Sequence, residues 1–189
     1  AVSATQTATP RATPDAPAAP GVTSGQNAQV SLTWAAPADN GSAITDYIVQ
    51  FSANGGTTWQ TFDDGVGAAT GATVTGLTNG TTYVFRVAAA NAAGTGAFSA
   101  ASGNAIPSTT PSAPTIDAIT PGNVQLSVAF TAGATGGSAI TDYQYSTDGA
   151  TWKTGATTTS PVLITETSPA GSNLLVNGTT YQVRIRAVN

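Results

Sequence analysis

Residues 41–47 read Gly-Ser-Ala-Ile-Thr-Asp-Tyr, and the same seven residues return at 137–143, 96 positions later. A second match lies downstream, where Asn-Gly-Thr-Thr-Tyr occurs at 79–83 and again at 177–181. A nearly constant offset over much of the chain indicates two tandem copies of one unit, each about 96 residues long. The sequence therefore predicts two domains of the same fold.

Apolar and polar residues alternate with period two in both copies, which predicts β-strands. Asn-Gly and Asp-Gly pairs separate these runs and supply the positive φ angles that tight turns need. No stretch shows the 3.6-residue apolar period of a helix. About seven short strands per copy, with turns between them, indicate a β-sandwich. The residues expected on the buried faces are Val30, Leu32, Trp34, Tyr83, Phe85, Val87 and Ala89 in the first copy, and Phe130, Tyr181, Val183, Ile185 and Ala187 in the second.

The first copy resembles the fibronectin type III family. The resemblance rests on Trp34 in the second predicted strand, Tyr83 near the start of the sixth, and Leu77 six residues before that tyrosine. The run from Asn91 to Ser99 also resembles the Asn-x-x-Gly-x-Gly-x-x-Ser turn that leads into the family's last strand. In the second copy Leu175 and Tyr181 fit the pattern, Phe130 replaces the tryptophan, and the chain stops at Asn189 before any Gly-x-Gly turn.

The resemblance implies a cysteine-free sandwich that serves as a spacer or binding module without catalysis of its own, and a tyrosine hydroxyl bonded to nearby backbone. The fold class expected is therefore all-β: two tandem immunoglobulin-like sandwiches in a rod, preceded by a stray final strand and a Pro-rich linker. The predicted boundaries are 1–16 for that strand and linker, 17–106 for domain 1, 107–113 for a linker, and 114–189 for domain 2 without its last strand.

Composition excludes most chemistry. The chain has 189 residues, of which 5 are basic and 9 acidic, for a net charge of −4, and it contains no His, Cys or Met. The missing His and Cys rule out an imidazole base, a thiolate nucleophile, a structural zinc site and disulfides. So few basic residues give no footprint for nucleic acid, and no apolar run approaches a membrane span. We predict that the chain is not an enzyme and that it has no catalytic, cofactor-binding or metal-binding residues and no cofactor.

Carboxylates are the remaining candidates for acid–base or metal chemistry. Asp46 and Asp142 occupy equivalent positions in the two copies, which favours a structural role, and Asp63 and Asp64 would point to opposite faces of a strand. Calcium could bind the loops around Asp39-Asn40-Gly41 and Asp63-Asp64-Gly65. The turn interpretation is favoured because the second copy has Thr135-Gly136-Gly137 where the first has Asp39-Asn40-Gly41.

Three further features have competing interpretations. Asn40, Asn79 and Asn177 match the N-glycosylation acceptor pattern, but each also lies in a predicted turn, which is favoured. Trp59 and Trp152 could stack against sugar rings, although packing over the sheet is the more economical role. Lys153 is the only lysine, which argues against Lys–Asn isopeptide crosslinks.

The leading functional hypothesis is a secreted or cell-surface bacterial structural protein, a stalk or filament segment of the kind found in adhesion assemblies. The partners expected are neighbouring copies or domains of the same array, with a surface glycan or another protein as further candidates. The alternatives are an accessory glycan-binding or spacer module of a secreted polysaccharide-degrading enzyme, and a decoration domain of a virion surface or tail.

The two ends of the chain match unevenly. The segment before Pro10 corresponds to the last strand of the first copy, residues 98–106, while the second copy lacks that strand after its sixth, expected at 179–188. One explanation is that the sequence is a window cut from a longer array. The other is that subunits polymerise head to tail, with residues 1–9 of one copy completing the second domain of the next by strand addition. The window is the more economical explanation.

Overall fold

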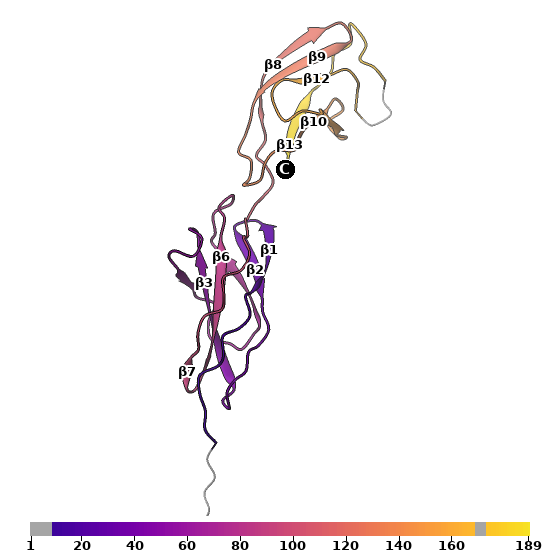
Figure 1. Cartoon of the computed structure of the whole chain (residues 1–189). Coiled ribbons are helices and arrows are strands. Elements are labelled where there is room, and N and C mark those ends of the chain that lie inside the picture. Colours follow the sequence, from indigo (N-terminus) through magenta and orange to yellow (C-terminus); the bar gives the residue numbers. More distant parts are fainter. Residues whose placement is uncertain (1–8, 169–172) are drawn as a thin grey trace, which may run out of the picture. The chain divides into compact units, whose positions relative to one another are not determined.

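The computed structural model describes residues 9–168 and 173–189, and the chain divides into two compact units, Ala1–Pro107 and Ser108–Asn189. Figure 1 shows strands and connecting loops in both units. Every regular element in the described part of the chain is a β-strand, which confirms the all-β prediction. In that part no helix is long and apolar enough to cross a membrane.

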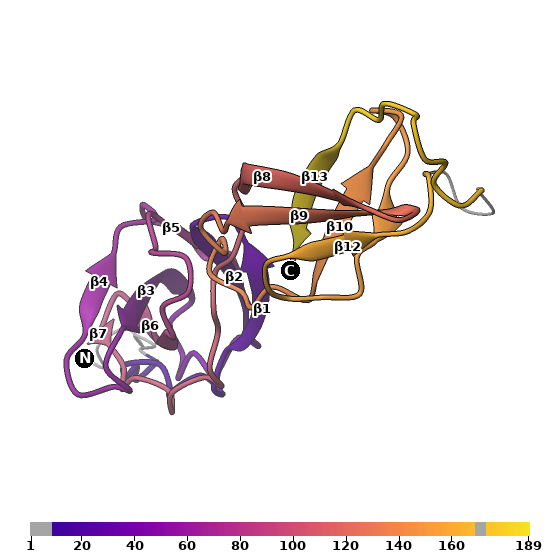
Figure 2. The ribbon, with the colours of Figure 1, turned by 90° about the horizontal axis from the view of Figure 1, so that it is seen from above.

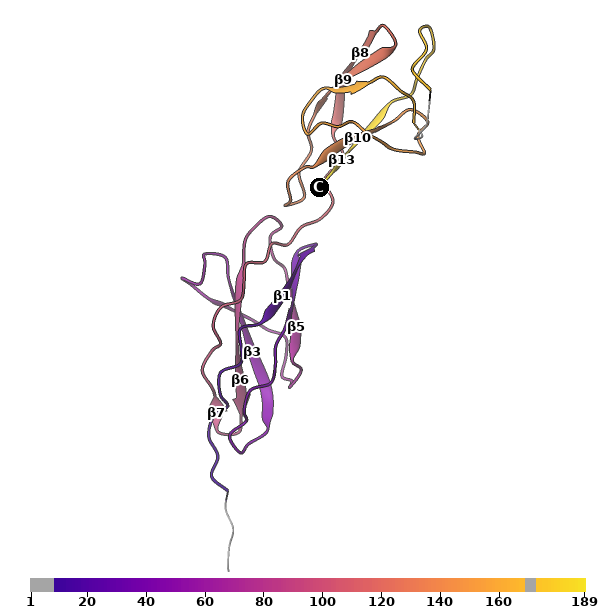
Figure 3. The same ribbon diagram turned by 45° about the vertical axis from the view of Figure 1, so that its right-hand side comes forward.

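The first unit is a sandwich of two antiparallel sheets. One sheet has the order β1-β2-β5 and the other β4-β3-β6-β7, and Figure 3 shows β3 and β6 side by side. The strands found among residues 9–107 are β1 (Gly21–Gln26), β2 (Gln29–Thr33), β3 (Ile44–Ser52), β4 (Gln60–Phe62), β5 (Gly71–Thr75), β6 (Val84–Asn91) and β7 (Gly94–Thr95).

The second unit repeats this plan with one strand fewer in its described part. Its sheets have the orders β12-β9-β8 and β11-β10-β13, and Figure 2 shows the long β8–β9 hairpin. The strands are β8 (Thr115–Gly122), β9 (Gln125–Thr131), β10 (Asp142–Ser146), β11 (Lys153–Thr154), β12 (Val162–Ile164) and β13 (Arg184–Val188). Strand β13 therefore stands at the edge of its sheet, where β6 of the first unit has a neighbour on both sides.

The core of the first unit lies between its sheets and follows the predicted alternation. Every residue expected on a buried face is buried, and Trp34 packs edge-on against Tyr47 with ring centroids 5.3 Å apart. Period-two alternation places these side chains on one face because successive residues of a strand point to opposite sides. The twelve buried residues of this cluster are Val30, Leu32, Trp34, Tyr47, Val49, Val74, Leu77, Tyr83, Phe85, Val87, Ala89 and Ala105.

The core of the second unit confirms Phe130 and corrects the burial predicted for Tyr181, Val183 and Ala187. Phe130 is buried and packs on Tyr143 with ring centroids 4.3 Å apart. Ile185 is also buried, but Tyr181, Val183 and Ala187 are only half-buried. The physical reason is the free edge, since a strand beside β13 would cover side chains that Ala105 and its neighbours cover in the first unit.

The sixth strand of the second unit is shorter than expected. The prediction placed it at 179–188, whereas β13 covers Arg184–Val188. Its partner β10 ends at Ser146, which pairs with Arg184, so residues before Arg184 have no strand to pair with on that side. The strand predicted over residues 1–9 lies, apart from Thr9, outside the described residues.

Candidate functional site

Both units have the tyrosine corner that the family resemblance implied. The hydroxyl of Tyr83 accepts a hydrogen bond from the backbone N–H of Thr78 at 3.1 Å, and the hydroxyl of Tyr181 accepts one from Val176 at 3.0 Å. Each bond spans five residues and fixes the loop that enters the sixth strand. These tyrosines therefore serve structure.

The two Asn-Gly-Thr sites are structural as well. Asn79 accepts a hydrogen bond from the backbone N–H of Ala28 at 2.8 Å and donates to the side chain of Asn27 at 2.8 Å. Asn177 bonds in the same way to Val124 at 2.9 Å and to Asn123 at 2.8 Å. In each unit the amide thereby joins the turn between the first two strands to the loop before the sixth, an arrangement that accounts for the repeated Asn without a sugar.

The Asp loops proposed for calcium are built as turns. Asp39 accepts a hydrogen bond from the N–H of Gly41 at 3.0 Å, and Asp63 accepts one from Gly65 at 3.2 Å. In the second unit the hydroxyl of Thr135 accepts the corresponding bond from Gly137 at 3.3 Å. The Thr135 hydroxyl thus accepts the bond that the Asp39 carboxylate accepts in the first unit, and both side chains stabilise a turn.

Three carboxylates of the first unit lie near one another. Asp63 and Asp64 follow the end of β4 instead of lying on a strand, so the opposite faces predicted for them do not arise. Burial raises the pKa of Asp64, and the charges of Asp46 and Asp63 raise it further. Asp46 also accepts a hydrogen bond from Gly67 at 3.0 Å. Within the described ranges, no group of three or more acidic side chains has the geometry to hold a metal ion.

The equivalent positions Asp46 and Asp142 differ in their surroundings. Asp46 lies within β3, while Asp142 is the first residue of β10, and its buried Oδ1 has no hydrogen-bond partner among the described residues. Each of the two belongs to a different compact unit. The absence of a catalytic role for Asp46 and Asp142 stays a prediction.

Each half-buried tryptophan of the sheet surface has an arginine over its ring. The guanidinium of Arg86 lies 4.2 Å from the ring centroid of Trp59, and that of Arg186 lies 4.4 Å from Trp152. Gln50 and Gln144 hold these arginines, each accepting two hydrogen bonds, at 2.9 and 2.7 Å. Cation–π contact of this kind covers one face of the indole, so the geometry favours the packing role over sugar stacking.

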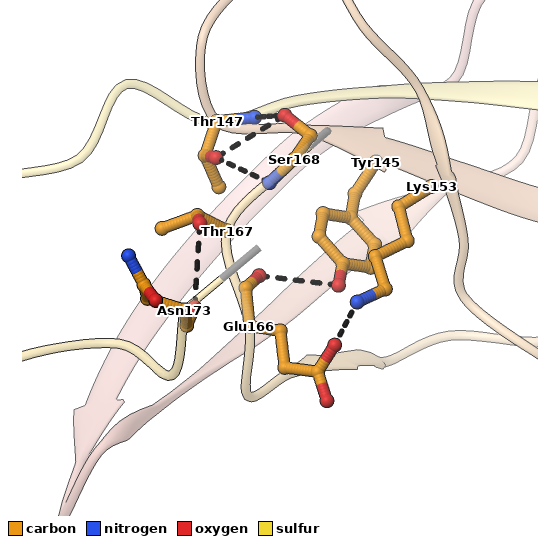
Figure 4. A network of polar contacts seen from close by, with 7 residues as sticks. All are labelled: Tyr145, Thr147, Lys153, Glu166, Thr167, Ser168 and Asn173. Carbon is orange, nitrogen blue, oxygen red and sulfur yellow. Dashed lines mark hydrogen bonds and ion pairs between the residues drawn. The ribbon is translucent and has the colours of Figure 1, made fainter. Parts of the chain in front are cut away.

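Lys153 belongs to a polar network in the second unit (Figure 4). Its ammonium forms an ion pair with Glu166, whose backbone carbonyl accepts a hydrogen bond from the hydroxyl of Tyr145 at 3.1 Å. Beside it, Thr147 and Ser168 bond reciprocally through backbone N–H and hydroxyl, at 2.8 and 2.9 Å. The network ties residues 166–168 to β10 and β11. Lys153 is paired with a glutamate here, and not with the asparagine that an isopeptide crosslink would use.

A pair of asparagines whose hydrogen bonds were not predicted closes one end of each sandwich. The side-chain amide of Asn91 donates to the carbonyls of Ala12 and Asp39, both at 2.9 Å. Asn189 donates likewise to Thr109 at 2.9 Å and to Thr135 at 2.8 Å. Asn at the end of the sixth strand recurs 98 positions later, and this recurrence was a signal that could have identified the role.

The two units differ most at the outer edge of the sixth strand. In the first unit, residues 94–105 follow this edge, and the N–H groups of Gly96, Ser99 and Ser102 each donate to the carbonyl of a β6 residue at 2.8 Å. In the second unit the edge of β13 carries no such bonds among the described residues, and a cavity of about 450 Å³ lies beside it, lined by residues 110–113 and 186–189.

Residues 15–103 match the family model described as "Fibronectin type III domain". The first unit is a fibronectin type III domain. Its boundaries enclose the tryptophan, leucine and tyrosine that carried the resemblance, and its seven strands and tyrosine corner agree with that assignment. The second unit has the same two-sheet plan without the seventh strand, among the residues described.

Similar proteins align with about half of this chain. Protein sidekick-1 of Mus musculus is 39% identical over 101 residues, which is 52% of this chain and 5% of that protein. Roundabout homolog 3 of Homo sapiens is 41% identical over 86 residues, which is 45% of this chain and 6% of that protein. The chain thus spans about a twentieth of the length of these relatives.

Two solved structures are also similar. A crystal structure of domains from titin has a TM-score of 0.46 and 37% identity, and covers 50% of this chain and 32% of that one. The crystal structure of chicken CNTN1 FN1-FN3 domains has a TM-score of 0.49 and 22% identity, and covers 93% of this chain and 62% of that one.

Proposed function

We propose that the chain is a non-catalytic structural module, in which tandem fibronectin type III-like units act as a spacer in an extracellular assembly such as a stalk or filament. The observation that carries the proposal is that the repeated asparagines, tyrosines and turn residues make the same intramolecular bonds in both units. Asn79 and Asn177 join loops, Tyr83 and Tyr181 form corners, and Asp39 has its counterpart in Thr135.

The surroundings proposed for this module are a secreted or cell-surface location, and a bacterial source. Support comes from composition alone: the chain has a single lysine and no cysteine, and only 7% of its residues are charged. The relatives reported above come from animals. The segments 10–17 and 107–114 are rich in proline, which favours extended and semi-rigid connections between units, as a spacer requires.

Binding assays test the proposal against the glycan-binding alternative. The chain would be mixed with insoluble cellulose, chitin and starch, and the bound fraction measured over a range of concentrations. A spacer predicts no saturable binding to any of the three. Saturable binding that is lost in Trp59→Ala or Trp152→Ala, but kept in a variant of an exposed polar residue of the other sheet, Thr23→Ala, would overturn the spacer role.

A further inference from the structure

The loop after β3 and the loop after β10 carry different groups at one equivalent position. Ser52 is the last residue of β3 and Ser146 is the last residue of β10. Two residues after these serines the first unit has Asn54 and the second unit has Asp148, and a glycine follows in both loops. An amide in one unit thus stands where the other unit has a carboxylate.

The two side chains accept the same kinds of hydrogen bond. Oδ1 of Asn54 accepts one from the hydroxyl of Ser52 at 2.8 Å and one from the N–H of Thr58 at 3.0 Å. Oδ1 of Asp148 accepts the corresponding bonds, from its serine hydroxyl at 3.0 Å and from the N–H of Thr151 at 2.9 Å. The same donors therefore surround a neutral oxygen in the first unit and a charged one in the second.

A threonine hydroxyl makes the remaining contact in both loops. The hydroxyl of Thr58 accepts a hydrogen bond from Nδ2 of Asn54 at 2.9 Å, whereas the hydroxyl of Thr151 donates one to Oδ2 of Asp148 at 2.5 Å. A hydroxyl can act in either way because it is both a donor and an acceptor. Hydrogen bonds from Thr151 and its neighbours lower the pKa of Asp148, so this loop stabilises a carboxylate.

An asparagine that precedes a glycine can react with the next backbone nitrogen. The nitrogen of Gly55 loses its proton to water and bonds to Cγ of Asn54, while the bond from Cγ to Nδ2 breaks. Nδ2 takes up a proton and leaves as ammonia, and a five-membered succinimide ring remains. Water then adds to Cγ, the bond from Cγ to the Gly55 nitrogen breaks, and that nitrogen regains a proton. In sum, one water is consumed, one ammonia is released and one aspartate is formed, without oxidation or reduction.

We propose that Asn54 is a deamidation site of the folded protein, and that the loop holds the aspartate product as it holds Asp148. The two hydrogen bonds to Oδ1 stabilise the negative charge that develops on this oxygen when Cγ is attacked. Asn54 is exposed to water, and the N–H of Gly55 has no hydrogen-bond partner among the described residues. The inference adds a modification site to the spacer role and does not depend on it.

The other three Asn-Gly pairs are poorer sites, because their amides donate to groups that a carboxylate would repel. Nδ2 of Asn79 and Nδ2 of Asn177 each donate to the side-chain oxygen of another asparagine, both at 2.8 Å. Nδ2 of Asn40 donates to the carbonyl of Thr13 at 2.9 Å and to the carboxylate of Asp15 at 3.0 Å. At position 54 the partner of the amide is a hydroxyl, which can become a donor.

Mass spectrometry measures the reaction at all four Asn-Gly pairs of the same chain. The full chain would be kept in mildly alkaline buffer and digested, and the change in mass at each asparagine located by fragmentation. The N–H of Gly80, which follows Asn79, donates to the carbonyl of Pro107 at 2.9 Å. Because local opening must first release this nitrogen, we expect Asn54 to react at least about tenfold faster than Asn79.

The chain unfolded in guanidinium chloride is the control, since the sequence is unchanged and the loop bonds are absent. There the four sites should react within a few-fold of one another. Equal rates in the folded chain, an Asn54 that does not react, or the same preference in the unfolded chain would overturn the proposal.

The ratio of the two possible products tests the part played by the loop. Water that adds to Cγ gives aspartate, whereas water that adds to the backbone carbonyl carbon of Asn54 gives isoaspartate, the usual major product of a flexible chain. Since the bonds from Ser52 and Thr58 make Cγ the more electrophilic carbon, we expect mainly aspartate in the folded chain and mainly isoaspartate in the unfolded one. Mainly isoaspartate at position 54 of the folded chain contradicts the proposal.

The variant Asn54→Asp carries the product from the start and tests whether the loop holds it. In calorimetry of the full chain we expect the Tm of the first unit to stay within about 2 °C of the original. Asn79→Asp is the matched control, because it places a carboxylate opposite the side-chain oxygen of Asn27, and it should lower the same Tm by more than about 4 °C. The proposal fails if Asn54→Asp lowers this Tm as much as Asn79→Asp does.

Discussion

Replacing Trp34 by alanine should unfold the first unit selectively. The side chain is only 9% exposed, packs on Tyr47 with ring centroids 5.3 Å apart, and belongs to the core cluster that joins the two sheets. Truncating a buried aromatic residue costs about 3–5 kcal/mol, out of a typical total stability of about 5–15 kcal/mol. For a domain of this size each kcal/mol lowers Tm by about 4–8 °C, so we expect a fall of at least about 12 °C.

Differential scanning calorimetry on the full chain is the assay, because it resolves one transition for each independent unit. The transition of the first unit should shift or disappear, while that of the second unit stays within about 2 °C of its original Tm. Trp59→Ala is the matched control, since this tryptophan is half-buried and lies outside the core cluster. The reasoning fails if Trp34→Ala lowers Tm no more than Trp59→Ala, or if both transitions fall together.

Three further outcomes are expected. Tyr83→Phe removes the acceptor of the Thr78 N–H and should lower the unfolding free energy of the first unit by about 1 kcal/mol. Tyr181→Phe should lower the unfolding free energy of the second unit by less, because the hydrogen bond of its corner is exposed. Equal losses of the two units in chemical denaturation would contradict this prediction. Asn79→Ala and Asn177→Ala should each cost about 1–2 kcal/mol, visible in calorimetry only in the unit that carries the change. Hydrogen bonds from Thr151, Ala150 and Ser146 lower the pKa of Asp148 below its usual range. The contribution of Asp148 to stability should therefore be complete above about pH 4 and be lost as the pH falls through the lowered pKa. An ordinary Asp titration curve for this residue by NMR would contradict the prediction.

Most of the fold could be predicted from the alternation of apolar and polar residues. Val30, Leu32 and Trp34 are buried as predicted because each step along a strand reverses the side-chain direction, which is a local property. The same rule overstated the burial of Tyr181 and Val183. Alternation reports which face a side chain takes, whereas burial also depends on whether a neighbouring strand covers the edge.

The contacts around Arg86 and Arg186 could not be read from the sequence. Each arginine meets its glutamine across the strand pair, Gln50 with Arg86 and Gln144 with Arg186. The register of the two strand pairs is the same in both units, since Tyr47 pairs with Ala89 and Tyr143 pairs with Ala187. Ser52 follows Tyr47 by five residues, but Ser146 follows Tyr143 by three. The strand that carries the glutamine therefore ends two residues sooner in the second unit, and the cluster lies two residues farther along the sixth strand at the same register. Pairing between distant segments, unlike alternation, is not written in a local pattern.

Amide hydrogen exchange measured by NMR tests most directly the claim that the edge of β6 is closed and the matching edge of β13 is open. In a dilute sample the N–H groups of Phe85 and Val87, which bond to Ser102 and Ser99, should exchange at least about tenfold more slowly than those of Ile185 and Ala187. Arg186, whose N–H faces β10, is the internal control and should be protected. The account is contradicted if, in the dilute monomer, Ile185 and Ala187 are already protected as strongly as Val87.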